Sequence, residues 1–233
     1  TKLDAYELVE DRKIEDLKRY GIDAILLENY SEIPLILADI EKKVKTKNIF
    51  ISGSASEYGK GWQDNGPKFI RQLTQNLYRH KNKIVTGHAM GVGSYIISTV
   101  IEECHSNVTK LENSLLIKAF PYQEKEREDY KTLIYNYREG ILENSGIAIF
   151  IFGNKKINNE TEFAEGVYQE FEIAKQANAY IIPVGSTGYM AQKIWSEINS
   201  EIEKYPYLSS DMDILGTCTD VDFLITTIMR IIE

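Results

Sequence analysis

The stretch Ile49-Phe50-Ile51-Ser52-Gly53-Ser54-Ala55 joins an apolar, β-branched run directly to a turn of small residues. A second stretch repeats this order, Ile84-Val85-Thr86-Gly87-His88-Ala89-Met90-Gly91-Val92-Gly93, and each stretch leads into a segment with helical periodicity. Small residues let a backbone approach a ligand closely, and the N–H groups at the start of a following helix attract anions. The two turns therefore predict a cradle for nucleotide phosphates, although glycine loops also serve as simple connectors.

On both sides of these stretches, apolar runs alternate with helix-period segments. The run Gly146–Phe152 has no polar alternation, so we expect a central strand that is buried on both faces. This pattern is typical of an α/β fold, a Rossmann-like open parallel sheet with helices on both faces. The expected strands are 48–52, 83–86, 114–118, 146–152 and 180–184, with a short one at 213–215. The expected helices are 66–80, 92–106, 125–144, 162–177, 188–204 and 219–232, and the polar run 158–162 is expected to be a surface loop.

Composition and charge narrow the class of protein. The chain of 233 residues is 43% hydrophobic and 27% charged, which is typical of a globular protein. Its net charge of -8 argues against broad binding to nucleic acid or anionic membranes. The two cysteines, Cys104 and Cys218, lack the spacing of zinc ligands and suit a reducing compartment. No apolar run approaches the about 20 residues that span a bilayer, so we expect a cytoplasmic protein.

Residues 1–47 differ in character from the rest of the chain. They supply a charged helix near 11–20, a strand near 22–27 and a helix near 32–44, which are too few elements to bury a core of their own. The chain also starts without methionine, inside what reads as an element. We interpret residues 1–47 as the end of a preceding domain plus a linker, and residues 48–233 as the main domain.

Two further loops are expected at the same edge of the sheet, because the carboxyl ends of parallel strands meet there. They are Gly153-Asn154-Lys155-Lys156 and Gly185-Ser186-Thr187-Gly188-Tyr189. Lys118 and Arg138 could neutralise a pyrophosphate at this edge, and Glu170 could accept hydrogen bonds from ribose hydroxyls. Each of these charged side chains is equally well explained by a solvated surface or a structural ion pair.

The aromatic residues in or beside the loops could stack on an adenine ring, although each is as readily explained by ordinary packing. They are Tyr58, Trp62, Tyr95, Phe120, Tyr122 and Tyr189. His88 is the histidine expected near a ligand. The spacing G-x-x-x-G-x-G of the second loop is neither the Rossmann fingerprint nor a Walker loop, and the G-x-S-x-G nucleophile elbow is missing. The residues therefore favour a binding site over a catalytic one.

These motifs together resemble those of an SLOG domain. The resemblance rests on five segments: Ile51–Ala55, Ile84–Gly93, Gly146–Lys155, Glu170–Ala174 and Ile181–Gly185. SLOG domains are Rossmann-like relatives of the cytokinin-activating LOG enzymes and of a DNA-processing protein. The chain is most similar to the SLOG sensor that follows a sirtuin-like NAD-cleaving domain in the effector of the Thoeris anti-phage system. The resemblance covers 48–233, and residues 1–47 resemble the end of the sirtuin-like domain.

The resemblance implies a mechanism in which a TIR-domain partner makes a cyclic ADP-ribose isomer. The SLOG domain binds this isomer, its packing against neighbouring copies in a dimer, tetramer or higher assembly changes, and the sirtuin-like domain is released to hydrolyse NAD. It implies no nucleic acid or membrane partner, and this chain would lack the catalytic centre. The implied ligand-binding residues are Gly53, Ser54, Ala55, Gly87, Met90, Gly91, Val92, Gly93, Lys118, Phe120, Arg138, Asn154, Lys155 and Glu170.

Three alternatives stay open. A LOG-like nucleoside monophosphate phosphoribohydrolase shares the fold, but its Pro-Gly-Gly-x-Gly-Thr-x-x-Glu loop is replaced here by Phe152-Gly153-Asn154-Lys155 and a polar insertion before Glu170. A DNA-processing protein would need a basic groove for a single strand, which the net charge disfavours. A purely structural oligomerisation module would bind no nucleotide.

Overall fold

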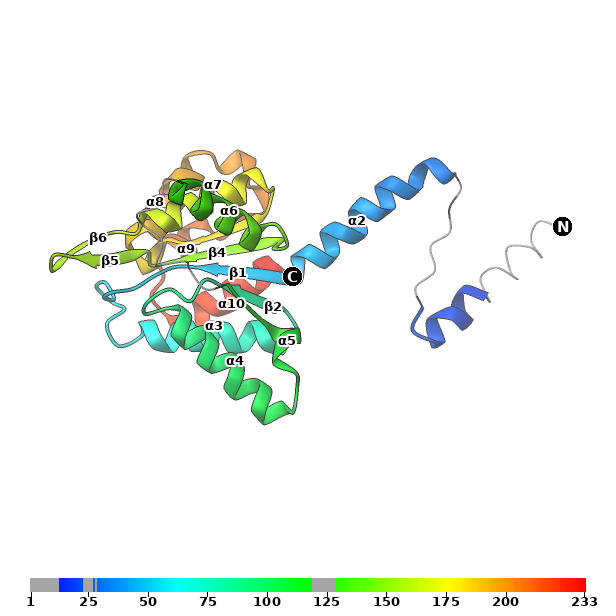
Figure 1. The fold of residues 1–233 in the computed structure, drawn as a ribbon, viewed down its shortest axis with the longest axis horizontal. Helices are drawn as coiled ribbons and strands as arrows, with labels where there is room; N and C mark the ends of the chain where they lie inside the picture. The colour runs from blue at the N-terminus through cyan, green and yellow to red at the C-terminus, as the bar shows by residue number, and fades with distance from the viewer. Residues whose placement is uncertain (1–12, 23–26, 28, 119–128) are drawn as a thin grey trace. The chain divides into compact units, whose positions relative to one another are not determined.

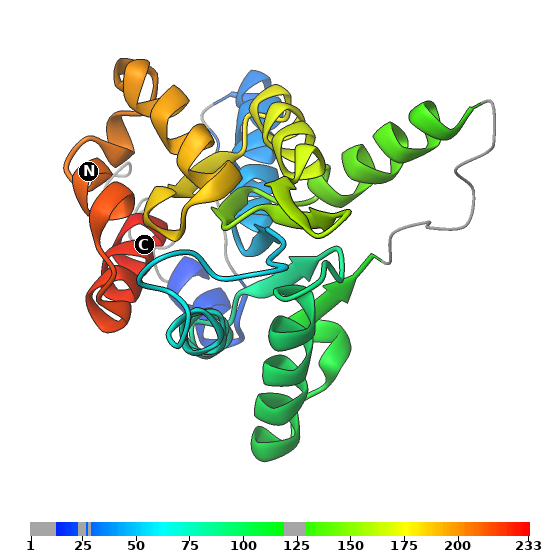
Figure 2. The ribbon, with the colours of Figure 1, turned by 90° about the vertical axis from the view of Figure 1, so that its left-hand side faces the viewer.

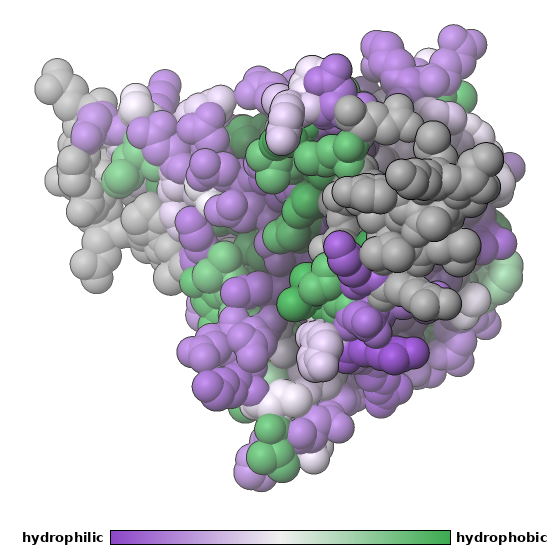
Figure 3. Space-filling model, turned by 90° about the vertical axis from the view of Figure 1, so that its right-hand side faces the viewer, coloured by the Kyte–Doolittle hydropathy of each residue, from purple (hydrophilic) through white to green (hydrophobic). Residues whose placement is uncertain are grey.

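The computed structural model describes residues 13–22, 27, 29–118 and 129–233 (Figure 1). The chain divides into two compact units, Thr1–Glu41 and Lys42–Glu233. The described part of the first unit is helical over 13–19, in the 3-10 turn η1 (Tyr30–Glu32) and in the first part of α2 (Ile33–Thr46), as expected. Residues 23–26 of the expected strand lie outside the described residues. No residue of α2 is buried. Figure 3 shows the hydrophobic residues on one face of the molecule in green.

Five parallel strands form the sheet of the second unit, in the order β3-β2-β1-β4-β7. The register places Ile49 of β1 opposite Ile84 on one side and Ile147 on the other. Every residue of β4 is buried, as the absence of polar alternation predicted. The five expected parallel strands are therefore confirmed: β1 (Asn48–Ser52), β2 (Lys83–Thr86), β3 (Leu115–Ile117), β4 (Ile147–Ile151) and β7 (Tyr180–Val184).

Helices cover both faces of this sheet. Apolar residues on α3 recur at helical spacing, so that Phe69, Leu73 and Leu77 are all buried against the sheet. One face carries α3 (Gly66–Arg79), α4 (Gly93–Asn107) and α10 (Val221–Ile232), and the other carries α6 (Tyr130–Leu142), α7 (Glu165–Gln176) and α8 (Tyr189–Ser200) (Figure 1). The remaining short elements are α5 (Leu111–Ser114), α9 (Met212–Thr217), η3 (Gly185–Thr187), η4 (Ile202–Lys204) and η5 (Pro206–Leu208).

Two expectations were wrong. The segment 213–215 is not a strand but lies within α9, where Met212 and Leu215 are buried one helical turn apart and the Met212 carbonyl accepts a hydrogen bond from Trp195 Nε1 at 2.8 Å. The polar run 158–162 is a turn only at Asn158 and Asn159, because its residues 160–162 belong to β6 (Glu160–Phe163), which pairs with β5 (Asn154–Ile157) in an antiparallel hairpin. The turn residues Asn158 and Asn159 both have positive φ, which suits a two-residue hairpin turn.

The strand order fixes where a ligand can bind. The chain builds β1, β2 and β3 outward in one direction and then returns to place β4 on the other side of β1. In open α/β sheets, ligands bind at the carboxyl ends of the strands where the order reverses in this way. Figure 2 looks onto these carboxyl ends and shows the hairpin β5–β6 beside them. Among the helices that the structure describes, none is long and apolar enough to cross a membrane.

Candidate functional site

The turn after β1 lies directly against the end of β4. A Cβ atom on Gly53 would come within 2.2 Å of the Ile151 carbonyl oxygen, so only glycine permits this approach. The Ser54 carbonyl accepts hydrogen bonds from the N–H groups of Gly153 and Asn154 at 2.9 and 3.0 Å, and Ser54 Oγ donates to the Asn154 carbonyl at 2.9 Å. The turns after β1 and β4 thus form one continuous backbone surface at the predicted crevice.

Asn154 holds the rest of the first loop. Its side chain is fully buried, and its Oδ1 accepts hydrogen bonds from the Ser56 N–H at 2.9 Å, Ser56 Oγ at 2.7 Å and the Glu57 N–H at 3.2 Å. Its Nδ2 donates to the Glu57 carbonyl at 3.0 Å. The carboxamide is therefore occupied within the protein, and Asn154 shapes the loop from the inside. The neighbouring Lys155 is exposed on β5, opposite Glu162.

The second glycine loop folds over the first. Gly91 has φ +71°, and a Cβ there would lie 1.9 Å from the Ala55 carbonyl oxygen. The Ala55 N–H donates to the Met90 carbonyl at 2.9 Å, and the Tyr58 hydroxyl donates to the Gly91 carbonyl at 2.7 Å. Val92 is buried, whereas the Met90 side chain is exposed. Helix α4 starts at Gly93 without a side-chain cap, and its Gly93 and Tyr95 N–H groups donate to the Ala89 and Val92 carbonyls at 2.8 and 3.1 Å, so what this end offers an anion is mainly the helix dipole.

The loop after β7 joins the first loop through two side chains. Trp62 Nε1 donates to the Ser186 carbonyl at 2.6 Å, and the Tyr189 hydroxyl donates to Glu57 Oε1 at 2.9 Å. The predicted convergence of four loops is therefore confirmed. Trp62, however, is 1% exposed and packs edge-on against Phe152, so it belongs to the core and is not available to stack on a base. Burial, followed by the hydrogen bond to Glu57, raises the pKa of Tyr189 to about 12.

A buried charged cluster lies next to these loops, at the end of β1. Ser52 Oγ donates to Glu170 Oε2 at 2.6 Å, and Arg138 Nε lies 3.5 Å from Glu170 Oε1. Arg138 also donates to Gln169 Oε1 at 2.5 Å. The side chains of Arg138 and Glu170 are only 9% and 16% exposed. Burial raises the pKa of the Glu170 carboxyl, although the Ser52 hydrogen bond and the Arg138 charge act in the opposite direction.

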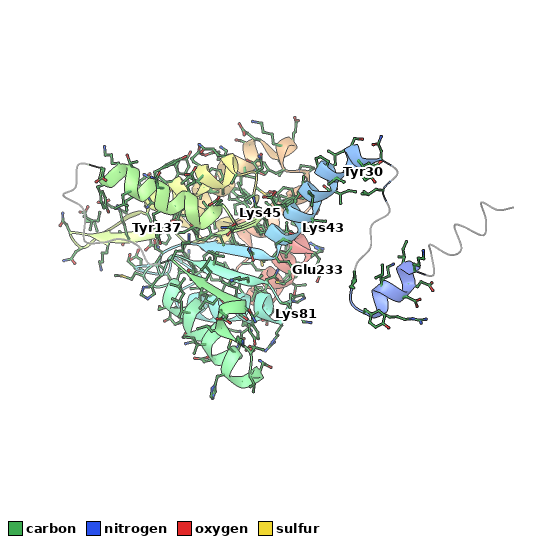
Figure 4. All side chains as sticks on the ribbon, turned by 45° about the vertical axis from the view of Figure 1, so that its right-hand side comes forward. Tyr30, Lys43, Lys45, Lys81, Tyr137 and Glu233 are labelled. Carbon is green, nitrogen blue, oxygen red and sulfur yellow. The ribbon has the colours of Figure 1, made fainter. Side chains whose placement is uncertain are left out.

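Lys118 follows β3 and reaches the C-terminal part of α6, the helix that also carries Arg138. Its Nζ donates to the Gly140 carbonyl at 2.9 Å, a favourable position for a cation at the C-terminal turn of a helix. The Tyr137 hydroxyl donates to the Lys118 carbonyl and faces Gly87, whose Cβ position would be 3.5 Å away (Tyr137 is labelled in Figure 4). Of the predicted ligand residues, Phe120 lies outside the described residues, as does Tyr122 among the other aromatics.

The structure therefore brings most of the predicted residues to one edge of the sheet. Sequence reasoning did not single out Ser52, Tyr137 or Gln169 as site residues, and the only signal for Ser52 was a polar residue at the end of an apolar strand. Chemically, the site offers backbone N–H groups, a guanidinium and a buried carboxyl, which suit phosphates and ribose hydroxyls. Among the described residues, no hydrogen bond joins His88 to a serine or carboxylate, and Ser52, Ser54 and Ser56 bond to Glu170 and Asn154 instead.

The fold defines an α/β domain of the SLOG class, and sequence comparison identifies its family. The model of the Sir2- and TIR-associating SLOG family, STALD, matches residues 32–233, and the chain belongs to this family. The match starts just before α2, and the predicted domain start at residue 48 stays a prediction.

The relatives that the chain matches are longer proteins. It is 36% identical over 228 residues to the NAD(+) hydrolase ThsA of Bacillus cereus (strain MSX-D12), covering 94% of this chain and 47% of that protein. It is 34% identical over 231 residues to the NAD(+) hydrolase ThsA of Cytobacillus dafuensis, covering 96% and 47%. A third relative, the NAD(+) hydrolase ThsA of Acinetobacter baumannii (strain 532279), is 32% identical over 209 residues, covering 86% and 43%. The chain spans about half the length of these curated relatives.

Proposed function

We propose that this chain is the sensor part of a longer, NAD-hydrolysing effector of anti-phage defence. A TIR-domain partner makes a cyclic ADP-ribose isomer, and the chain binds this activating ligand in the crevice between β1 and β4. Binding changes the packing of a cytoplasmic homo-oligomer, a dimer or tetramer, and releases a sirtuin-like domain to hydrolyse its substrate NAD. The sensor binds its ligand without converting it.

The observation that carries this proposal is the junction of the backbone cradle with the buried charged cluster. Ser52 and Gly53 are consecutive, so Glu170 and the turns after β1 and β4 lie beside one another. A cyclic ADP-ribose carries two phosphates and several ribose hydroxyls. The phosphates suit the positive end of the α4 dipole and the Arg138 guanidinium, and the hydroxyls suit the Glu170 carboxyl. The relatives named NAD(+) hydrolase support the same assignment.

Isothermal titration of the chain with each cyclic ADP-ribose isomer tests the proposal. We expect micromolar or tighter binding of one isomer. Glu170→Gln should weaken it by roughly 1.5–3 kcal/mol, the contribution of a hydrogen bond to a charged group. Glu172→Gln is the matched control, because Glu172 lies on the same helix but is 42% exposed and pairs with Lys175. No binding of any isomer, or an equal loss in both variants, would refute the proposal.

A second function is favoured by one observation. Glu170 is a buried carboxyl of raised pKa beside an arginine, an arrangement that can protonate a leaving base. This suits a LOG-like phosphoribohydrolase, although the hairpin β5–β6 occupies the place of the glycine-rich loop of those enzymes. Incubation with AMP distinguishes the two functions. Adenine released by the wild-type chain and not by Glu170→Gln would establish the hydrolase, and intact AMP would exclude it.

A further inference from the structure

Phe163 is an exposed aromatic residue at the base of the hairpin β5–β6. It ends β6, whose other residues Glu160, Thr161 and Glu162 are polar, and 47% of Phe163 is accessible to solvent. Exposure of a phenyl ring forgoes the roughly 1.5–3 kcal/mol that its burial would contribute. A half-exposed phenyl ring on an otherwise polar strand is available for a binding contact, and its position suggests which one.

The strand register places this ring on the side of the hairpin that faces the first loop. Phe163 is directly opposite Asn154, and opposite residues of an antiparallel pair lie on the same face with Cβ atoms about 4.5–5.5 Å apart. The Asn154 side chain points to Ser56 and Glu57. The Phe163 ring accordingly lies on the face of the hairpin that the Asn154 side chain shares, toward the first loop.

The residue after Phe163 connects the hairpin to the turn after β4 and to the helix that carries Glu170. The Ala164 N–H donates to the Gly153 carbonyl at 2.9 Å, and Ala164 is the N-cap of α7, the helix that carries Glu170. Phe163 thus lies between the turn after β4 and the first turn of α7. Trp62, which sequence reasoning offered for base stacking, is used in the core, and the Tyr58 and Tyr189 hydroxyls bond within the protein.

We propose that Phe163 stacks on the purine base of the nucleotide bound in the crevice. The proposal rests on the proposed function, because it needs a nucleotide whose phosphates lie at the glycine turns. It gives the hairpin a role as one wall of the binding site. The face of a phenyl ring is suited to this contact because every base has a complementary π-face.

Titration of three variants with the cyclic ADP-ribose isomer that the wild-type chain binds tests the stacking role. Phe163→Ala should weaken binding about 5- to 150-fold, the range for loss of one aromatic–base stack. Ile157→Ala is the matched control, because Ile157 is an exposed apolar residue on the opposite face of the same hairpin. Its affinity should stay within about twofold of wild type, as expected for a surface change.

Phe163→Trp adds a fluorescence measurement that would not respond to ligand if Phe163 had only a structural role. Its affinity should stay close to that of wild type, and ligand should change its fluorescence beyond any change from Trp62 and Trp195 in the wild-type chain. Wild-type affinity in Phe163→Ala, or no additional fluorescence change in Phe163→Trp, overturns the stacking role alone. If the wild-type chain binds no isomer, the proposed function fails and the stacking role fails with it.

Discussion

Asn154 allows a quantitative test of how the first loop is held, because one buried side chain makes four hydrogen bonds to it. Oδ1 accepts three, from Ser56 and Glu57, and Nδ2 donates one to Glu57. A net hydrogen bond contributes about 0.5–1.5 kcal/mol, so four would contribute roughly 2–6 kcal/mol. Ser56 is half-buried and Glu57 is exposed, so water replaces part of what Asn154→Ala removes. We therefore expect a loss at the lower end, about 2–3 kcal/mol.

Urea denaturation and thermal melting, both followed by circular dichroism, measure this loss. For a domain of 150–250 residues, about 1 kcal/mol lowers Tm by about 2–4 °C, so Asn154→Ala should melt about 5–10 °C below wild type. Lys155→Ala is the control, because Lys155 is the next residue, lies on the same strand and is exposed. It should change stability by less than about 0.5 kcal/mol. A Tm for Asn154→Ala no lower than that of Lys155→Ala would show that the Asn154 hydrogen bonds do not stabilise the first loop.

Two further predictions concern the glycine turn and the buried carboxyl. Gly91→Ala should destabilise the chain by about 2–4 kcal/mol in urea denaturation, since a Cβ would meet the Ala55 carbonyl at 1.9 Å. Gly188→Ala, at φ +82° and ψ −173° but with open space, should cost about 1–3 kcal/mol from backbone strain alone, and a loss as large as that of Gly91→Ala would contradict the clash. In the folded chain the pKa of the Glu170 carboxyl is raised above its ordinary value of 4.5. Ionisation of this carboxyl therefore costs the folded state stability, and wild type should become less stable relative to Glu170→Gln as pH rises from 4.5 through the raised pKa. A pH-independent difference would contradict this.

The parallel strands could be predicted from the sequence because burial on both faces requires continuous apolar runs, as in β4. The hairpin β5–β6 could not, since each of its faces is mostly polar with a single apolar residue, Ile157 or Phe163, and its signal is the pair Asn158-Asn159, which tolerates positive φ. The segment 213–215 is too short for its period to separate strand from helix, and packing of α9 against Trp195 decides it.

The candidate site could likewise be predicted only in part. Glycines mark close backbone approach, so the turns after β1 and β2 could be found in the sequence. The partners of the charged residues could not be found in the sequence, because they depend on how α6 packs against α7. Arg138 and Glu170 lie 32 positions apart, and Ser52 lies 118 positions from Glu170. Residue type identified Arg138 and Glu170 as candidates, and only the packing showed that they form one buried cluster with Ser52.

The hydrogen bonds that hold the first loop affect how tightly the proposed site can bind a small ligand. Asn154, the Ala55 N–H and the Tyr58 hydroxyl fix this loop before any ligand arrives. A segment that is already ordered loses little conformational entropy when a ligand binds, so more of the contact energy appears as affinity. In the proposed function, the site is therefore preorganised before its ligand binds. Removing one of these hydrogen bonds should therefore weaken ligand binding, although every contact between the ligand and the protein is kept.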